Sequence, residues 1–272
     1  MKLQYHIADT KIILDSNFEL ADSPSWRRFS DNSETVDFTF FCYRSPLLPQ
    51  LPESKNLHSY FDSVKGRTYA LTRHFEDHTD IYLAEENLPW GQTVDQLFTQ
   101  LAMTHVLLKK SKLLLHAAYI LTEKGAILFT APSGTGKSTQ AELWQKYRGA
   151  KIINGDRAVV GFHGEIPMAY GFPLSGSSAI CVNQTAPLRA IVRLHQGEEN
   201  SIRLLRGAEA VSVLLNGTAI PEEYKEDLPK IMDTAILLAQ NIPILDFSCL
   251  PDESAIFVLE QTLKSFENGG LK

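Results

Sequence analysis

A glycine-rich stretch, APSGTGKS at residues 131–138, contains the residue types that bind phosphate groups. It matches the P-loop pattern G-x-x-x-x-G-K-S/T, except that alanine stands at the first position. The glycines allow backbone N–H groups to turn toward phosphate oxygens, lysine adds a positive charge, and the serine hydroxyl is a ligand for Mg²⁺. The stretch therefore predicts a binding site for ATP and Mg²⁺. The residues expected to form it are Ser133, Gly134, Thr135, Gly136, Lys137, Ser138 and Thr139.

The segments on either side of this stretch decide between a phosphate site and a chance match. At average composition, Gly-Lys followed by Ser or Thr occurs in roughly one chain in seven of this length. Here GAILFT, before the stretch, is typical of a buried strand, and STQAELWQKY, which starts at Ser138, is typical of a helix. The alternative is a helix-opening loop that binds nothing. A dinucleotide site is excluded, because Thr139 stands where the last glycine of G-x-G-x-x-G belongs.

A histidine is expected at the edge of this stretch. If TEKG, residues 122–125, forms a hairpin turn, Leu121 pairs with Ala126. The same register places His116 opposite Ala131. The structural alternative is a hydrogen-bonded core histidine, since His116 stands between leucine and alanine.

An aspartate is expected at the same edge. The strand KIIN, residues 151–154, should run parallel to AILFT and end beside it, which brings Asp156 close and Arg157 after it. A carboxylate there could hold Mg²⁺ together with Ser138. NGDR also spells an ordinary turn. Asp246, in IPILDF, is a rival acid that could instead end an edge strand, and Asp15, in KIILD, is a weaker one.

The elements that must position these residues change in character along the chain. Residues 1–92 show short alternating stretches such as KIILD, VDFTFFCYR and DIYLAEE, which predict a small β-rich domain with a possible role in substrate selection. Residues 93–110 have the apolar spacing of an amphipathic helix. Strand-like and helical runs then alternate to the end, which predicts a P-loop domain over residues 93–272 with a mixed sheet covered by helices, an α/β fold.

Composition narrows the possible functions. The 272 residues are 44% hydrophobic and 21% charged, as in a globular protein, and the formal net charge is −6, which disfavours a nucleic-acid partner. The three cysteines show no C-x-x-C spacing, so neither a disulfide framework nor a zinc site is predicted. We expect no signal peptide, no membrane span and a cytoplasmic location.

Taken together, the His116 strand, APSGTGKS and NGDR resemble the HPr kinase and phosphoenolpyruvate carboxykinase type of P-loop protein over residues 113–194. The resemblance implies that nucleotide lies on the glycine-rich stretch, that one carboxylate helps to hold the metal, and that another acts as general base toward a serine hydroxyl. The family carries Asp-Asp-Arg where this chain has Gly155, Asp156 and Arg157. Asp156 or His116 would have to replace the missing acid.

Two other segments are similar to uncharacterised HPr-kinase-related proteins. YGFPLSGSSAI contains Ser175, Gly176, Ser177 and Ser178, which would present N–H and O–H groups to a phosphate or carboxylate, or would cap a helix. APLRAIVRL is expected to be a buried strand that turns Arg189 toward the site.

These observations predict a Mg²⁺- and ATP-dependent kinase that transfers the γ-phosphate to a hydroxyl of a peptide, protein or small molecule, most simply a serine hydroxyl. Lys137, Asp156 and His116 are the expected catalytic residues, and Ser138 and Asp156 are the expected metal ligands. A homo-oligomer is compatible with the sequence, and no motif distinguishes ATP from GTP. The alternative is a catalytically weak nucleotide-binding switch or scaffold. Decarboxylation is disfavoured, because no histidine, lysine and aspartate set for a second metal is found.

Overall fold

The computed structural model describes residues 1–85, 92–218 and 227–269. The chain forms two compact units, Met1–Val106 and Leu107–Lys272. The domain limits predicted from the sequence pattern, 1–92 and 93–272, differ from these units by the segment 93–106. None of the helices in the described ranges is long and apolar enough to cross a membrane.

The first unit is built on a six-stranded sheet with strand order β1-β2-β3-β6-β5-β4. Buried and partly exposed residues alternate along β2, as expected of a strand with one face on a core. The β-rich character predicted for this part of the chain is therefore confirmed. The strands are β1 (Lys2–Ile7), β2 (Thr10–Ser16), β3 (Phe38–Ser45), β4 (Leu57–Asp62), β5 (Arg67–His74) and β6 (His78–Ala84).

The helical segments of this unit are short. The single amphipathic helix predicted over residues 93–110 is wrong, because Ala102 adopts a left-handed conformation, with φ 45°, and divides it. Local apolar spacing cannot reveal such a break. The segments are α1 (Pro24–Arg27), η2 (Asp95–Leu97), α2 (Phe98–Leu101) and α3 (Met103–Leu108), which crosses the division between the units.

The second unit contains a mixed eight-stranded sheet with the order β11-β10-β7-β8-β12-β14-β13, and β9 pairs with β7 beside this path. The predicted α/β class is confirmed at this level. Three of its strands, β10, β11 and β13, were not predicted. The strands are β7 (Leu113–Thr122), β8 (Gly125–Thr130), β9 (Lys151–Asn154), β10 (Arg157–His163), β11 (Ile166–Tyr170), β12 (Thr185–Gln196), β13 (Ser201–Leu205) and β14 (Ile244–Cys249).

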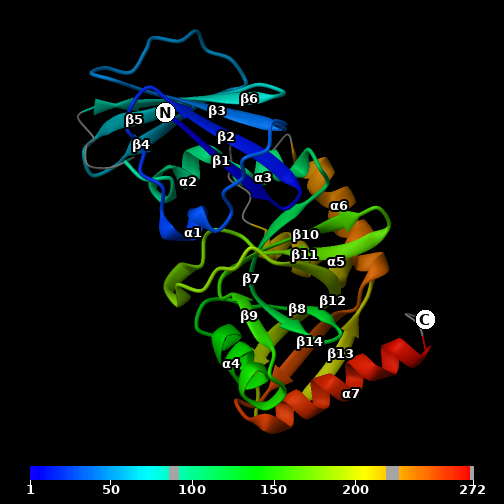
Figure 1. Cartoon of the computed structure of the whole chain (residues 1–272). Helices are drawn as coiled ribbons and strands as arrows, with labels where there is room; N and C mark the ends of the chain where they lie inside the picture. Colours follow the sequence, from blue (N-terminus) through cyan, green and yellow to red (C-terminus); the bar gives the residue numbers. More distant parts are fainter. Residues whose placement is uncertain (86–91, 219–226, 270–272) are drawn as a thin grey trace. The chain divides into compact units, whose positions relative to one another are not determined.

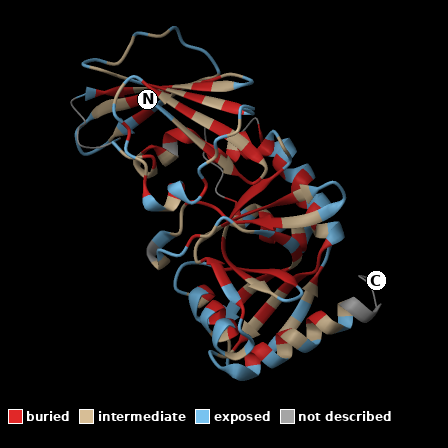
Figure 2. Cartoon of the chain, in the orientation of Figure 1, coloured by how far each residue is buried: buried red, intermediate tan, exposed pale blue. Residues whose placement is uncertain are grey.

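Helices cover both faces of this sheet (Figure 1). One core lies under α4 (Lys137–Arg148) and α7 (Glu253–Gly269), and includes Trp144 and Leu259. The other lies under α5 (Gly207–Gly217) and α6 (Leu228–Asn241), and includes Leu214 and Leu238. Figure 2 shows buried residues along the central strands and exposed residues on the outer sides of the helices. The central strands are therefore covered on both faces.

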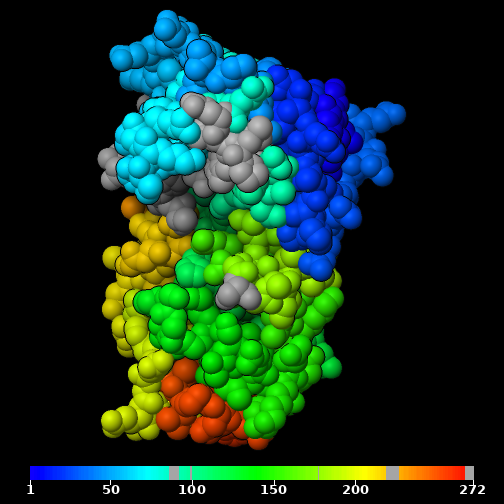
Figure 3. Space-filling model, turned by 90° about the vertical axis from the view of Figure 1, so that its left-hand side faces the viewer, coloured from blue at the N-terminus to red at the C-terminus, as the bar shows by residue number. Residues whose placement is uncertain are grey.

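The two helices on the first face are also joined at their surfaces. Arg148, at the end of α4, donates from Nε to Glu260 of α7 at 3.2 Å, and its Nη1 lies 3.6 Å from Glu253. In Figure 3 the green surface of α4 lies beside the orange-red surface at the start of α7. These contacts fix the helix that follows the glycine-rich stretch.

Candidate active site

The glycine-rich loop, residues 131–138, joins β8 to α4. β8 ends at Thr130 and α4 begins at Lys137, so the predicted order of strand, glycine-rich turn and helix is confirmed. Gly134 and Gly136 have φ values of 79° and 111°, and a Cβ at either position would meet no atom within 4 Å. Their role is conformational, because other residues rarely adopt such positive φ values. The loop delivers the chain to a helix start whose free N–H groups favour an anion.

Lys137 closes the loop on itself. Its side chain is buried, and Nζ donates to the carbonyl oxygens of Ala131 at 2.8 Å and Pro132 at 3.4 Å. Burial, as the largest cause, lowers the pKa of Lys137, and the carboxylate of Asp156 opposes that shift. The ammonium group is thus held at the beginning of the loop, directly after β8.

The hairpin before the loop has the predicted register. Leu121 pairs with Ala126 and Ala117 pairs with Thr130, which carries His116 to the position opposite Ala131. The hydroxyl of Thr130 donates to the carbonyl oxygen of His116 at 3.2 Å.

His116 and Asp156 lie within hydrogen-bonding distance of each other. Nε2 of His116 lies 2.9 Å from Oδ1 of Asp156, and Nε of Arg157 lies 3.3 Å from Oδ2 of the same carboxylate. The two side chains are 35% and 28% exposed, so solvent or a ligand can reach both. Burial is the largest cause that lowers the pKa of His116, followed by the charge of Lys137, while Asp156 acts in the opposite direction. A neutral imidazole at neutral pH can accept a proton.

Asp156 follows β9, which is parallel to β8 but is not its direct neighbour in the sheet. β9 pairs antiparallel with β7, and β8 also pairs antiparallel with β7. β8 and β9 therefore run in the same direction, as predicted, but β7 lies between them. The carbonyl oxygen of Asp156 accepts a hydrogen bond from the N–H of Ala117 in β7 at 3.0 Å.

Asn154, which the sequence did not single out, organises the turn that carries Asp156. Its Oδ1 accepts from the N–H groups of Asp156 and Arg157 at 2.8 and 2.9 Å. Its Nδ2 donates to the carbonyl oxygens of Phe172 and Leu174, both at 2.8 Å. Asn154 is completely buried. One side chain therefore joins the Asp156 turn to the segment that leads into the serine-rich turn.

That serine-rich turn, residues 175–178, fits closely against Gly155 and Asp156. A Cβ at Gly155 would overlap the side chain of Ser178, and a Cβ at Gly176 would lie 2.8 Å from Cγ of Asp156. Ser178 donates from its hydroxyl to the carbonyl oxygen of Ser175 at 2.7 Å. The space next to Gly155 is thus filled by Ser178, at the position where the resemblance expects a second carboxylate.

The predicted residues gather around a cavity of about 280 Å³, here named the Lys137 cavity. Of the nine residues predicted as catalytic, phosphate-binding or metal-binding, Thr135 alone lies outside its wall. It is lined by His116, Ser133, Gly134, Gly136, Lys137, Ser138, Thr139, Gly155, Asp156, Ser175 and Ser178.

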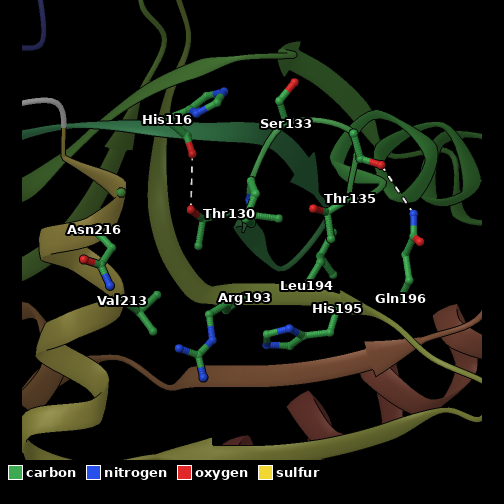
Figure 4. Close-up of a pocket in the computed structure, with 14 residues that line it drawn as sticks. His116, Thr130, Ser133, Thr135, Arg193, Leu194, His195, Gln196, Val213 and Asn216 are labelled. Carbon is green, nitrogen blue, oxygen red and sulfur yellow. Dashed lines mark hydrogen bonds between the residues drawn. The ribbon is translucent and has the colours of Figure 1, made fainter.

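A larger cavity, of about 680 Å³, touches the first half of the loop and is here named the Arg193 cavity. Figure 4 shows Arg193 and His195 extending from β12, Val213 and Asn216 from α5, and His116 and Ser133 on the opposite side. His116, Ser133 and Gly134 belong to the walls of both cavities. The lining residues are His116, Thr130, Ala131, Pro132, Ser133, Gly134, Thr135, Arg193, Leu194, His195, Gln196, Val213, Asn216 and Gly217.

β12 presents a different arginine to the site from the one expected. Arg189 lies near the start of β12, and a Cβ added at Gly125 would be 3.6 Å from its Cβ. Gly125 is the first residue of β8, at the end of the strand away from the glycine-rich loop. The predicted orientation of Arg189 toward the loop is therefore wrong. Arg193 pairs in register with Thr130 at the loop end of β8. The register between parallel strands, which no short turn fixes, decided between the two arginines.

Asp246 is also part of this region and does not end an edge strand. It lies in β14, between β12 and β13, and pairs in register with Arg193. Its Oδ1 accepts from Arg193 Nε at 2.7 Å and lies 2.7 Å from His195 Nε2. Burial alone would raise the pKa of Asp246, but the hydrogen bonds from Arg193 and His195 lower it. Asp15 belongs to the first unit.

No protein-family model matches the chain, and no curated protein matches it. Among solved structures, the chain is similar to the Hpr(Ser) kinase/phosphatase from Coxiella burnetii, with a TM-score of 0.34 and 12% identity over 57% of this chain and 94% of that chain. A likeness at this TM-score and identity does not assign a family.

Two residues in the wall of the Lys137 cavity have oxygen atoms suited to a metal. The Ser138 hydroxyl and the Asp156 carboxylate both line it. Mg²⁺ usually takes one or two carboxylates from the protein and completes its shell with substrate phosphates and water. One hydroxyl and one carboxylate in the wall of this cavity fit that mode of binding.

Proposed function

We propose that the protein is a Mg²⁺-dependent kinase that transfers the γ-phosphate of ATP to a hydroxyl group. One observation carries this proposal: the His116–Asp156 pair shares the Lys137 cavity with Lys137, Ser138 and the start of α4. A cation, a helix N-terminus and an acid–base pair thus face one space, which is the combination that phosphoryl transfer needs.

In this function the glycine-rich loop holds the phosphates. Backbone N–H groups at residues 134–139 donate to phosphate oxygens, and Lys137 leaves the carbonyl oxygens of Ala131 and Pro132 to contact the β and γ phosphates. Ser138 and Asp156 would hold Mg²⁺, which neutralises charge on the phosphates when bound. The protein contributes position and electrostatics, because a loose transition state needs little covalent help.

His116 or Asp156 takes the proton of the acceptor hydroxyl. Both are partly exposed, and the hydrogen bond between them fixes the imidazole in one orientation. A single carboxylate then serves where the resemblance implies two. The acceptor is a hydroxyl of a peptide, a protein or a small molecule.

The test uses γ-labelled ATP. The purified full chain is incubated with Mg²⁺, the labelled nucleotide and a fractionated extract, and the label is followed by the size of the molecule that carries it. We expect label on an acceptor with wild-type protein and its loss with Lys137→Ala. Lys146→Ala is the matched control, because Lys146 lies exposed on the same helix and outside both cavities. Label that never leaves ATP, despite measured binding, would reject the kinase.

The second candidate is a nucleotide-binding switch that transfers little or no phosphate. The contact between Gly155 and Ser178 favours it, since Ser178 fills the space in which a second carboxylate would stand. It predicts Mg²⁺-ATP binding with negligible turnover. The labelling experiment separates the two candidates.

A further inference from the structure

The Arg193 cavity meets the first half of the glycine-rich loop, residues 131–135. Ala131 and Pro132 line it, whereas Ser138 and Thr139 line the Lys137 cavity instead. The ammonium group of Lys137 also lies at this end, on the carbonyl oxygens of Ala131 and Pro132. In a phosphate-binding loop the lysine reaches the β and γ phosphates, and the backbone N–H groups of the loop hold the α and β phosphates. The position of the Lys137 ammonium group therefore places the γ-phosphate beside the Arg193 cavity.

Asp246 holds the side chains of Arg193 and His195, the polar groups of this cavity, in position. Its Oδ1 binds Arg193 Nε and His195 Nε2, each at 2.7 Å, and Nη2 of Arg203 lies 3.5 Å from Oδ2. Within the described part of the chain, the two Nη groups of Arg193 make no hydrogen bond. A guanidinium group held by Nε presents its remaining N–H donors as a fork, which fits the two oxygens of a carboxylate.

The dimensions of the Arg193 cavity suit a small molecule. About 680 Å³ lies within the range of small-molecule sites, which combine apolar walls with a few fixed polar groups. Here Val213 and Pro132 supply apolar surface, and Arg193 and His195 supply the polar groups. His116, which belongs to both cavities, stands between such a ligand and the phosphates.

We propose that the Arg193 cavity binds the phosphate acceptor, and that this acceptor is a small alcohol that carries a carboxylate. The inference rests on the proposed kinase function. The carboxylate pairs with Arg193, and the hydroxyl extends past His116 to the γ-phosphate. The hydroxyl oxygen forms a bond to the γ phosphorus, the bond from that phosphorus to the β–γ bridging oxygen breaks, ADP leaves, and the hydroxyl proton passes to His116 or Asp156.

The first experiment identifies the chemical class of the acceptor. Full-length protein, Mg²⁺ and γ-labelled ATP are incubated separately with the small-molecule ultrafiltrate and with the protein fraction of an extract. The labelled product is purified and treated with phosphatase, and the released acceptor, which no longer carries the label, is analysed by mass spectrometry for a carboxylate group. A labelled small molecule whose acceptor carries a carboxylate supports the proposal. Label on protein, or on an acceptor without a carboxylate, overturns it and leaves the kinase function intact. Absence of transfer with measured ATP binding rejects the kinase, and the acceptor proposal with it.

The second experiment tests Arg193 itself with that acceptor. Loss of a charged, bidentate partner predicts that Arg193→Gln raises the acceptor KM roughly 10- to 100-fold, with the ATP KM within about twofold of wild type. Arg193→Lys keeps the positive charge but loses the paired N–H donors, so its acceptor KM should lie between those of wild type and Arg193→Gln. Arg189→Gln, on the same strand but at its far end, is the matched control and should leave both KM values unchanged. A variant in which the ATP KM rises instead would assign the cavity to the nucleoside and overturn the proposal. Retained binding of Mg²⁺-ATP shows that each variant is folded.

Discussion

At the scale of single residues, Gly155 and Ser178 are fitted to each other. A side chain at position 155 would overlap Ser178, which in turn donates to the carbonyl oxygen of Ser175. The side chain of an aspartate at position 155 would therefore not fit beside Ser178 in this conformation. Adding one would require the serine-rich turn to move.

Gly155→Ala should destabilise the second unit by about 1 to 3 kcal/mol, the usual cost of overpacking. Gly155→Ala combined with Ser178→Gly should recover most of that loss, because the second change removes the overlapping atoms. Thermal unfolding of the four proteins in this cycle measures the coupling. Additive effects of the two substitutions would show that the contact is absent.

Lys137 is the residue whose removal should affect transfer most directly. Lys137→Ala should cost on the order of 3 kcal/mol of transition-state stabilisation, about a hundredfold in rate, because a charge next to the γ-phosphate is lost. The rate of phosphate transfer is compared with that of Lys146→Ala. Nearly full activity in Lys137→Ala would mean that phosphates bind elsewhere.

At the scale of elements, Asn154 at the end of β9 connects two turns that are far apart in the sequence. It accepts from the N–H groups of Asp156 and Arg157 and donates to the carbonyl oxygens of Phe172 and Leu174. The position of Asp156 beside His116 depends on this side chain and on the hydrogen bond from the N–H of Ala117 to the carbonyl oxygen of Asp156.

Asn154→Ala should lower the free energy of unfolding by about 3 kcal/mol, because buried N–H and C=O groups lose their partners. Asn154→Asp keeps the acceptor for the Asp156 turn but sets a carboxylate against two carbonyl oxygens, so it should also destabilise. Denaturant unfolding measures both. Wild-type stability in Asn154→Ala would show that water or a shifted backbone replaces the four hydrogen bonds.

At the scale of the whole molecule, the rate of thiol labelling at the cysteines can measure the opening of each unit separately. Cys42 lies in the first unit, Cys181 and Cys249 lie in the second, and all three are buried. Burial raises the pKa of Cys42 to about 12, so its thiol stays protonated at pH 8 and reacts only when the first unit opens.

Mg²⁺-ATP should therefore slow thiol labelling at Cys181 and Cys249 but not at Cys42. Saturation at a hundred times Kd stabilises the binding unit by about 2.7 kcal/mol, which lowers the population of its open form about a hundredfold. Mass spectrometry of peptides labelled at pH 8 gives the rate at each cysteine. Equal protection of all three would show that the two units open together, and protection of Cys42 alone would place the nucleotide in the first unit.

The sequence by itself determined the local parts of this protein. The glycine-rich loop, its flanking strand and helix, and the pairing of Leu121 with Ala126 follow from apolar periodicity and a short turn, which act over a few residues. His116 could be placed from that register alone.

The tertiary structure alone decided which distant residues complete the site. Parallel strands are joined by long connections that do not fix register, so the sequence pattern favoured Arg189 where packing presents Arg193. The position of Asp246 was also decided by packing, because β14 pairs with β12 on one side and β13 on the other. The contact of Ser178 with Gly155 joins two loops that are separate in the sequence. Such contacts arise from packing of the whole unit, because no local rule of spacing or turn chemistry relates residues so far apart.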